Sequence, residues 1–229
     1  LWYMFFEALN SETERGEIAY STSIDCVNWS YGSVVLQEPF HLSYPQVFAH
    51  NQEIYMLPET RQDGSVRLYR AVEMPNRWEC VATLLYGEFA DATILHYQDL
   101  WWIFAQRGLD EMRLFWSESL TGKWYEHPQN PLWPGDRRRT RPAGRMLFYQ
   151  GQLLRFAQDG WPSYGSQVRV FAVDHLSKSE YREHELDQSP ILEATGTGWN
   201  GTAMHHIDAI TLEDGRWLAA VDGASLALF

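Results

Sequence analysis

The stretch YPQVFAHNQEIYMLPE, residues 44–59, decides the fold of this chain. Apolar side chains recur on both sides of HNQ (50–52), a short polar segment of the kind that joins two strands in a hairpin. The second half of the hairpin ends on an acid, Glu59. Two further strands follow the hairpin, so this part of the chain predicts four short antiparallel strands at 44–52, 53–59, 65–72 and 78–86.

The same pattern, an apolar strand that ends in a polar residue, recurs along the whole chain. The polar residues are Glu7, Glu59, Gln106, Gln158 with Asp159, and Asp222. Their spacing is about fifty residues, which is typical of β-propeller blades of four antiparallel strands, and helical periodicity is nearly absent. The sequence therefore predicts an all-β fold, a five-bladed β-propeller.

The expected blades divide the chain into five modules of one propeller domain, residues 1–229. Their approximate bounds are 1–38, 41–86, 89–133, 142–192 and 202–229. The first blade is expected to lack its innermost strand, and the last to end soon after its second strand, with residues 225–229 as a further candidate strand. An open blade edge invites pairing with another chain, so self-association through that edge is expected.

Net charge and composition limit the classes of partner that this chain can bind. The net charge is −12, which argues against nucleic acid and against anionic membrane as partners. No run approaches the ~20 apolar residues that a spanning helix needs, and no basic segment precedes an apolar stretch as in a secretory leader. We therefore expect a cytoplasmic protein with no nucleic-acid or membrane partner. The two cysteines show no metal-binding spacing, and neither a metal nor a cofactor is expected.

Polar residues at recurring strand ends are candidate ligand-binding groups. In a propeller the innermost strands line a central funnel, so such residues are expected to lie together although they are far apart in the sequence. Glu7, Gln158 and Asp159 are candidates on this ground, and Tyr44 is a candidate for stacking on a sugar ring. The alternative is that the polar strand ends only satisfy backbone amides between blades.

The pair His205–His206 is expected on a strand, with the two side chains on opposite faces. His206 and Asp208 would then share a face. A histidine beside a carboxylate can transfer a proton or contribute to a metal site, although two groups do not complete one. His206 is therefore a candidate ligand-binding residue.

The basic stretch RRRTRPAGR, residues 137–145, stands out in an acidic chain. Residues 137–139 are interpreted as a solvated loop. Arg145 is expected to enter the innermost strand of the fourth blade and to point near the funnel. Because an arginine fork binds carboxylate or phosphate through two parallel hydrogen bonds, Arg145 makes either an internal ion pair or a contact with an anionic sugar.

Three segments carry a resemblance to a known family. HLSYPQVFAHNQEIYMLPETRQDGSVRLYRAV, GRMLFYQGQLLRFAQDGWPSYGSQVRVFAV and GWNGTAMHHIDAITLEDGRWLAAVDG resemble the propeller domain at the N-terminus of plant glucosamine inositolphosphorylceramide transferases. That domain is distantly similar to the five-bladed arabinanase, levansucrase and invertase group, whose members hydrolyse or transfer sugars with carboxylates in the funnel. The family has an Arg-Asn-Gly-Gly-Arg word where this chain reads Arg141-Pro142-Ala143-Gly144-Arg145, so Arg141 joins Arg145 as a candidate ligand-binding residue.

The resemblance implies a carbohydrate ligand and leaves two functions open. Asp91 matches an acid of the family and is the first candidate for catalysis, with Glu59 and Asp208 as further acids. Hydrolysis needs two carboxylates about 5–9.5 Å apart. The family carries one on its first strand, and the sequence given does not contain that strand. The chain is therefore expected to be either glycoside hydrolase-like or a non-catalytic carbohydrate-binding or scaffold propeller beside a separate transferase domain.

Overall fold

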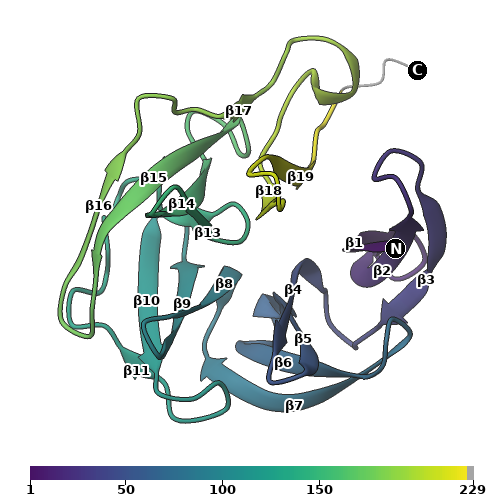
Figure 1. Ribbon diagram of the computed structural model, residues 1–229, viewed down its shortest axis with the longest axis horizontal. Coiled ribbons are helices and arrows are strands. Elements are labelled where there is room, and N and C mark those ends of the chain that lie inside the picture. Colours follow the sequence, from purple (N-terminus) through teal and green to yellow (C-terminus); the bar gives the residue numbers. More distant parts are fainter. Residues whose placement is uncertain (226–229) are drawn as a thin grey trace. The chain divides into compact units, whose positions relative to one another are not determined.

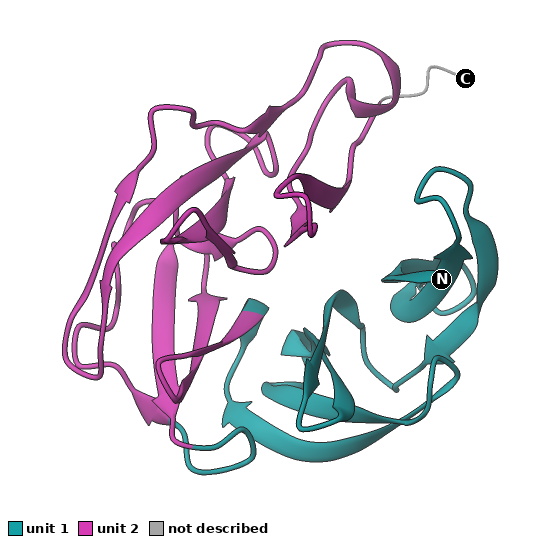
Figure 2. Ribbon diagram, viewed as in Figure 1, with its two compact units in different colours: residues 1–92, 119–124 teal, residues 93–118, 125–229 magenta. Residues whose placement is uncertain are grey.

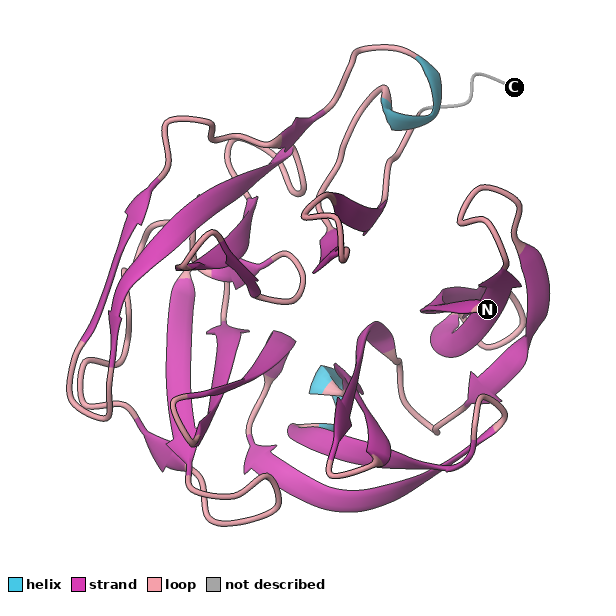
Figure 3. Ribbon diagram, viewed as in Figure 1, coloured by secondary structure: helices cyan, strands magenta, loops and turns pink. Residues whose placement is uncertain are grey.

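The computed structural model describes residues 1–225, and its regular structure is almost entirely β-strand (Figure 3). The chain forms two compact units, coloured separately in Figure 2. Unit 1 comprises residues 1–92 and 119–124, and unit 2 comprises residues 93–118 and the chain from 125 onward. Among the described residues, no helix is long and apolar enough to cross a membrane.

Unit 1 contains two antiparallel sheets (Figure 1). The first runs in the order β1-β2-β3, with strands β1 (Trp2–Asn10), β2 (Arg15–Ser23) and β3 (Ser30–Leu36). The second runs in the order β4-β5-β6-β7, with strands β4 (Ser43–His50), β5 (Glu53–Glu59), β6 (Ser65–Glu73) and β7 (Arg77–Tyr86). A short 3₁₀ helix, η1 (Arg61–Asp63), joins β5 to β6.

Three further sheets follow in the sequence. The third, in the order β11-β10-β9-β8, has strands β8 (Phe89–Tyr97), β9 (Leu100–Arg107), β10 (Glu111–Ser117) and β11 (Tyr125–Glu126). The fourth, built on the path β12-β14-β15-β16, has strands β12 (Arg141–Pro142), β13 (Leu147–Tyr149), β14 (Gln152–Asp159), β15 (Gln167–Leu176), β16 (Tyr181–Glu185) and β17 (Leu192–Glu193). The last is a hairpin of β18 (Ile207–Thr211) and β19 (Trp217–Val221), preceded by the 3₁₀ helix η2 (Gly198–Asn200).

The four strands predicted between residues 44 and 86 are confirmed, each to within two residues at either end. The all-β propeller architecture is also confirmed, with four blades formed. Residues 207–221 form only the β18–β19 hairpin, so the five-bladed count stays a prediction. The candidate strand at 225–229 lies almost wholly outside the described residues. That the chain folds as one domain, and that it self-associates, also stay predictions.

The tight polar turns inferred from the sequence have a common geometry. Three hairpins, β4–β5, β8–β9 and β13–β14, close through two residues that both have positive φ. The pairs are Asn51 with Gln52, Gln98 with Asp99, and Gln150 with Gly151. Two consecutive left-handed residues match the right-handed twist of the flanking strands, which is why such turns dominate two-residue hairpins.

Glycine allows two neighbouring sheets to approach closely in each unit. In unit 1 the Leu42 N–H donates to the Gly16 carbonyl over 2.9 Å, and a Cβ on Gly16 would lie 2.2 Å from the Leu42 oxygen. In unit 2 the Ile207 N–H donates to Ala143 over 2.7 Å, and a Cβ on Gly144 would lie 1.7 Å from the Ile207 oxygen. No side chain fits at either glycine.

One strand differs from the prediction. The chain from Gly144 to Gln152 was expected to enter a single innermost strand, whereas the structure has the two short strands β12 and β13 with Gly144 and Arg145 between them. Gly144 has a φ of +137°, a conformation that interrupts a strand. Arg145 therefore lies in a bend, not in a strand.

Candidate functional site

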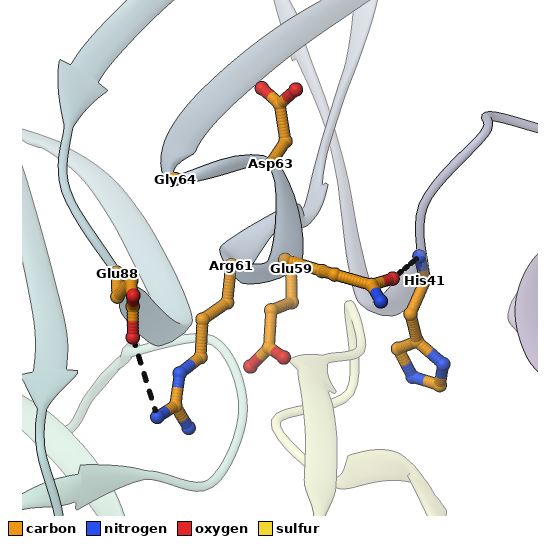
Figure 4. Close-up of a pocket in the computed structure, with 7 residues that line it drawn as sticks. His41, Glu59, Arg61, Asp63, Gly64 and Glu88 are labelled. Atoms are coloured by element: carbon orange, nitrogen blue, oxygen red, sulfur yellow. Dashed lines mark hydrogen bonds and ion pairs between the residues drawn. The ribbon is translucent and has the colours of Figure 1, made fainter.

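Unit 1 contains an open hollow of about 550 Å³ at the end of β5 (Figure 4). Its lining is mostly polar and comes from the segment before β4, from the β5–β6 connection and from the residue before β8. The lining residues are His41, Glu59, Arg61, Gln62, Asp63, Gly64 and Glu88. A polar hollow with several convergent hydrogen-bonding groups is a candidate ligand site.

Glu59 is the last residue of β5, and its side chain points into the hollow between Arg61 and His41 (Figure 4). Its Oε2 atom accepts a hydrogen bond of 2.9 Å from the backbone N–H of Asp91. The turn of η1 directs Arg61 to the same hollow, where its Nη2 atom is 4.0 Å from Glu88 Oε2. The structure thus brings together two of the three predicted catalytic acids, Glu59 and Asp91.

Asp91 is 5 % exposed and has a φ of +48°, in the left-handed region that non-glycine residues rarely adopt. Tyr44 has the same φ at the start of β4, where the register with β5 shifts between Ser43 and Gln46. The first strands of two consecutive sheets, β4 and β8, therefore each have a strained residue near their N-terminal end. Such strain costs of order 1–3 kcal/mol and is concentrated at ligand sites.

Glu7, predicted as a ligand-binding residue, lies beside His41. The N–H of Gly16 donates to His41 Nδ1 over 2.9 Å, so the neutral ring carries its proton on Nε2. That nitrogen is 3.3 Å from Glu7 Oε1. The backbone N–H of His41 donates to Gln62 Oε1 over 2.6 Å, which fixes His41 at the edge of the hollow.

In unit 2 the predicted residues Arg145 and Asp208 bind each other. Nη2 of Arg145 donates to Asp208 Oδ2 over 2.8 Å, and Nε donates to Oδ1, so the guanidinium forms a fork with the carboxylate. Of the two alternatives for Arg145, the structure holds the internal ion pair. An anionic ligand that binds the same Nε and Nη2 edge would have to displace Asp208, and the fork occupies both carboxylate oxygens of this candidate catalytic acid.

The two histidines lie before β18, not on it. The predicted strand at 205–215 begins only at Ile207, because the N–H groups of His205 and His206 donate to Asp222 Oδ1 over 2.9 and 2.8 Å. Nδ1 of His205 pairs with the other oxygen of Asp222. Burial would raise the pKa of Asp222, but the His205 side chain and these two N–H groups lower it below its usual range. The prediction that both histidines lie on a strand was therefore wrong, and the shared face of His206 and Asp208 stays a prediction.

Three more of the polar strand ends have local partners. Asp159 is buried and accepts hydrogen bonds from the Trp161 N–H, from Gln167 Nε2 and from Arg169 Nε, each within 2.9 Å. Gln158 Nε2 is 3.5 Å from the His205 carbonyl, a marginal hydrogen bond. Gln106 donates to the Leu109 carbonyl over 2.8 Å. Asp159 and Gln106 thus bond close to their own strands, whereas Gln158 approaches the segment before β18.

Arg141 pairs with Gln158 in the register of β12 and β14, and its guanidinium carbon lies 5.1 Å from the centre of the Tyr164 ring. The ring of Tyr164 in turn meets His205 edge-on, with 5.2 Å between ring centres. The loop after β14 thus covers Arg141 with an aromatic side chain. Within residues 1–225, no three histidine, cysteine or carboxylate side chains gather closely enough to hold a metal ion.

Residues 1–224 match the family described as glucosamine inositolphosphorylceramide transferase 1, N-terminal. The chain belongs to this family. The glucosamine inositolphosphorylceramide transferase 1 proteins of Oryza sativa subsp. japonica and Arabidopsis thaliana are 36 % and 37 % identical to 96 % of the chain. The chain spans 31 % and 30 % of the length of these two relatives.

Solved structures with a similar fold include glycoside hydrolases. An α-L-arabinofuranosidase of family GH62 from Coprinopsis cinerea has a TM-score of 0.69 at 14 % identity, over 91 % of this chain and 73 % of that one. The Podospora anserina α-L-arabinofuranosidase in complex with cellotriose has a TM-score of 0.68 at 13 % identity, over 91 % and 72 % of the two chains. At this identity the likeness establishes the all-β propeller fold of this family member and nothing more.

Sequence reasoning missed the most buried charges of this domain. Arg155 on β14 donates two hydrogen bonds of 2.6 and 2.5 Å to Glu183 on β16, which also accepts from Arg139 and from the Tyr181 hydroxyl. Arg139 lies 3.8 Å from the centre of the Trp133 ring, so the solvated-loop interpretation was wrong for this residue. Burial would raise the pKa of Glu183, but Arg155 lowers it.

A signal for this buried cluster was present in the sequence. Arg155 interrupts the otherwise apolar run of β14, and a buried arginine needs an acid partner. Its partner is 28 residues away in the sequence, on β16.

Proposed function

We propose that this domain binds a carbohydrate at the hollow beside Glu59 and has no hydrolytic activity of its own. The observation that carries the proposal is the open, mostly polar hollow that Glu59 borders. Asp208 is forked by Arg145, and Asp159 is held by Arg169, whereas Glu59 borders an open hollow. The groups around Glu59 include donors on Arg61 and Gln62, and sugar hydroxyls need both donors and acceptors.

The comparisons support a carbohydrate ligand. The curated relatives are named as transferases of an inositolphosphorylceramide, and the chain covers less than a third of their length. Similar solved structures include enzymes in complex with cellotriose and with galactose. We infer that the domain is an accessory to a transferase carried elsewhere in a longer protein, and that its propeller has five blades.

Glycoside hydrolysis is the second candidate, and Asp91 is the observation that favours it. This acid is buried and held in a strained backbone conformation, and its N–H is bonded to the carboxylate of Glu59. Hydrolysis of a glycosidic bond needs two carboxyl groups beside it, and the contact between Glu59 and the Asp91 backbone brings two candidate acids to one place.

The test of carbohydrate binding is a glycan array followed by titration of the best ligand into the wild-type domain and into Glu59→Gln. Loss of the charged acceptor is expected to weaken binding at least about tenfold. Glu53→Gln is the matched control, because Glu53 starts the same strand but does not line the hollow. This variant should bind as the wild type does. Equal affinity of Glu59→Gln and wild type would reject the proposal.

Hydrolysis is tested on the same ligands by the release of reducing sugar. We expect binding without release. Release by the wild type that is abolished in Asp91→Asn, with binding retained in that variant, would establish the second candidate instead. Asparagine preserves the size of the side chain and tolerates the left-handed conformation of residue 91, so the fold is not expected to change.

A further inference from the structure

The first sheet of unit 1 carries a protruding apolar surface that the proposed sugar site does not use. Its residues are Ile24, Val27 and Trp29 on the β2–β3 loop and Tyr31 on β3, here called the apolar tip. Ile24 is 85 % and Val27 77 % exposed, and the two aromatic side chains are also exposed. The loop projects beyond the ends of its two strands (Figure 3). Exposed large apolar side chains that gather in one place mark interaction sites.

Within the apolar tip, aliphatic and aromatic side chains occupy different places. Ile24 and Val27 occupy the loop itself, whereas Trp29 and Tyr31 stand where β3 begins. Trp2, also exposed, is the register partner of Ser23 at the base of the same loop. The apolar tip thus has aliphatic side chains at its apex and tryptophan and tyrosine around its base. Proteins that enter the interface of a lipid bilayer have the same distribution.

The tip also satisfies its own backbone. The N–H groups of residues 25–28 all bond to side chains within the loop. Those of Asp25 and Cys26 donate to Ser23 Oγ, and those of Val27 and Asn28 donate to Asp25 Oδ1. A docked protein can supply partners for exposed N–H groups, but hydrocarbon cannot, so internal satisfaction of four consecutive groups favours lipid over protein.

The charge of the tip and of the whole chain favours a lipid surface that has no net charge. From Cys26 to Gln37 the chain contains no Asp, Glu, Lys or Arg. The one acid of the loop, Asp25, has its pKa lowered by hydrogen bonds from Asn28 and Val27 and from Ser23, and its carboxylate accepts bonds inside the loop. The whole chain carries a net charge of −12, which repels an anionic surface but not a neutral one.

We propose that the apolar tip inserts into the interfacial region of a lipid bilayer whose surface has no net charge. The absence of a membrane partner expected from the sequence rested on repulsion by anionic lipid and on the lack of a spanning segment. Neither argument concerns shallow contact by a loop. Two aliphatic and two aromatic side chains give weak, reversible attachment, not permanent anchoring.

The test is co-sedimentation of the whole chain with phosphatidylcholine vesicles. The double variant Ile24→Asp with Val27→Asp is expected to lower the affinity at least about tenfold. Leu9→Asp is the matched control, because Leu9 is 69 % exposed at the opposite end of the same sheet. Vesicles that contain phosphatidylserine should bind less protein. Failure of the wild type to sediment, an equal loss in Leu9→Asp, or tighter binding to phosphatidylserine would overturn the proposal.

Two variants of Asp25 distinguish whether vesicle binding depends on insertion of the loop or only on its charge. Asp25→Ala removes a negative charge but leaves the Val27 and Asn28 N–H groups without their acceptor, so it should weaken binding, whereas Asp25→Asn keeps an acceptor and should retain it. Stronger binding by Asp25→Ala would show that charge alone matters and would reject insertion. Brominated phosphatidylcholine should quench part of the tryptophan fluorescence, and the double variant Trp2→Phe with Trp29→Phe should remove that part. Quenching that survives in the double variant would place the contact elsewhere.

Discussion

Glu59 and Asp159 end the second strands of two sheets, yet their surroundings differ. Glu59 borders an open hollow, and its Oε2 atom accepts the backbone N–H of Asp91 at 2.9 Å. Asp159 is 1 % exposed, and its carboxylate accepts a backbone N–H, an amide and a guanidinium. The recurring strand pattern placed an acid at both positions, but the pattern does not determine what the acid does. For Asp159 the structure supplies an arginine partner on the next strand, Arg169.

The largest expected effect on stability concerns the most buried charged residues. Glu183→Gln leaves Arg155 buried without a counter-charge, and we expect it to lower the free energy of unfolding by about 3–5 kcal/mol. Urea unfolding followed by tryptophan fluorescence measures this. Glu185→Gln on the same strand is the control, because Glu185 is more than a third exposed and its replacement should cost about 1 kcal/mol or less. Equal costs would show that burial does not separate these two acids.

A smaller loss is expected at the end of β14. Asp159→Asn removes the charge that Arg169 Nε binds at 2.8 Å, while Arg169 keeps its second acid, Glu185, at 2.7 Å. The free energy of unfolding should fall by about 1.5–3 kcal/mol, the contribution of a hydrogen bond to a charged group. Urea unfolding of Asp174→Asn, a partly exposed acid on β15, gives the baseline. No difference between the two variants would mean that Asp159 is not clamped.

At the hollow, the same kind of change should hardly alter stability. In Glu59→Gln the amide oxygen can still accept the Asp91 N–H, so the free energy of unfolding should change by less than about 0.5 kcal/mol. In Glu59→Ala that N–H has no acceptor from residue 59, and a loss of about 1–3 kcal/mol is expected. If Glu59→Gln proves as destabilising as Asp159→Asn, the expected difference between an acid held by Arg169 and an acid at the hollow is absent.

The smallest expected effect concerns pH. His127 is buried, and burial lowers its pKa although the Ser177 carbonyl acts in the opposite direction. The unfolded chain, in which histidine has its usual pKa of about 6.5, therefore binds the proton first as the pH falls. Stability is retained above that value and decreases as the pH falls toward the lower pKa of the folded state. Urea midpoints between neutral and mildly acidic pH should decrease less in His127→Gln; parallel curves would contradict this assignment.

The strands could be read from the sequence because their determinants are local. Alternating apolar residues around Asn51 and Gln52 fix both strands of the β4–β5 hairpin, and the same holds for Gln98 with Asp99. Interruptions of a strand were harder to predict. The left-handed backbone at Asp91, and the split caused by Gly144, depend on how neighbouring sheets meet, which no hairpin pattern contains.

The candidate site could be predicted only in part. Glu59 and Asp91 were both identified, but their contact joins residues 32 positions apart, and nothing in either segment specifies it. The clamp on Asp159 and the cluster around Glu183 were missed because the choice of partner for a buried charge is a property of the folded sheet. Arg155 is an exception, because an arginine within an apolar strand predicts a buried acidic partner even before that partner is identified.

Gly16 and Gly144, where two sheets approach closely, have a practical consequence for the design of chimaeric proteins with this fold. At Gly16 and Gly144 a Cβ would lie 2.2 and 1.7 Å from a carbonyl oxygen of the neighbouring sheet. A hairpin transplanted from a relative must therefore bring a glycine at this place, or the adjoining module has to shift. The two glycines also offer reference positions for aligning distant relatives whose loops differ in length.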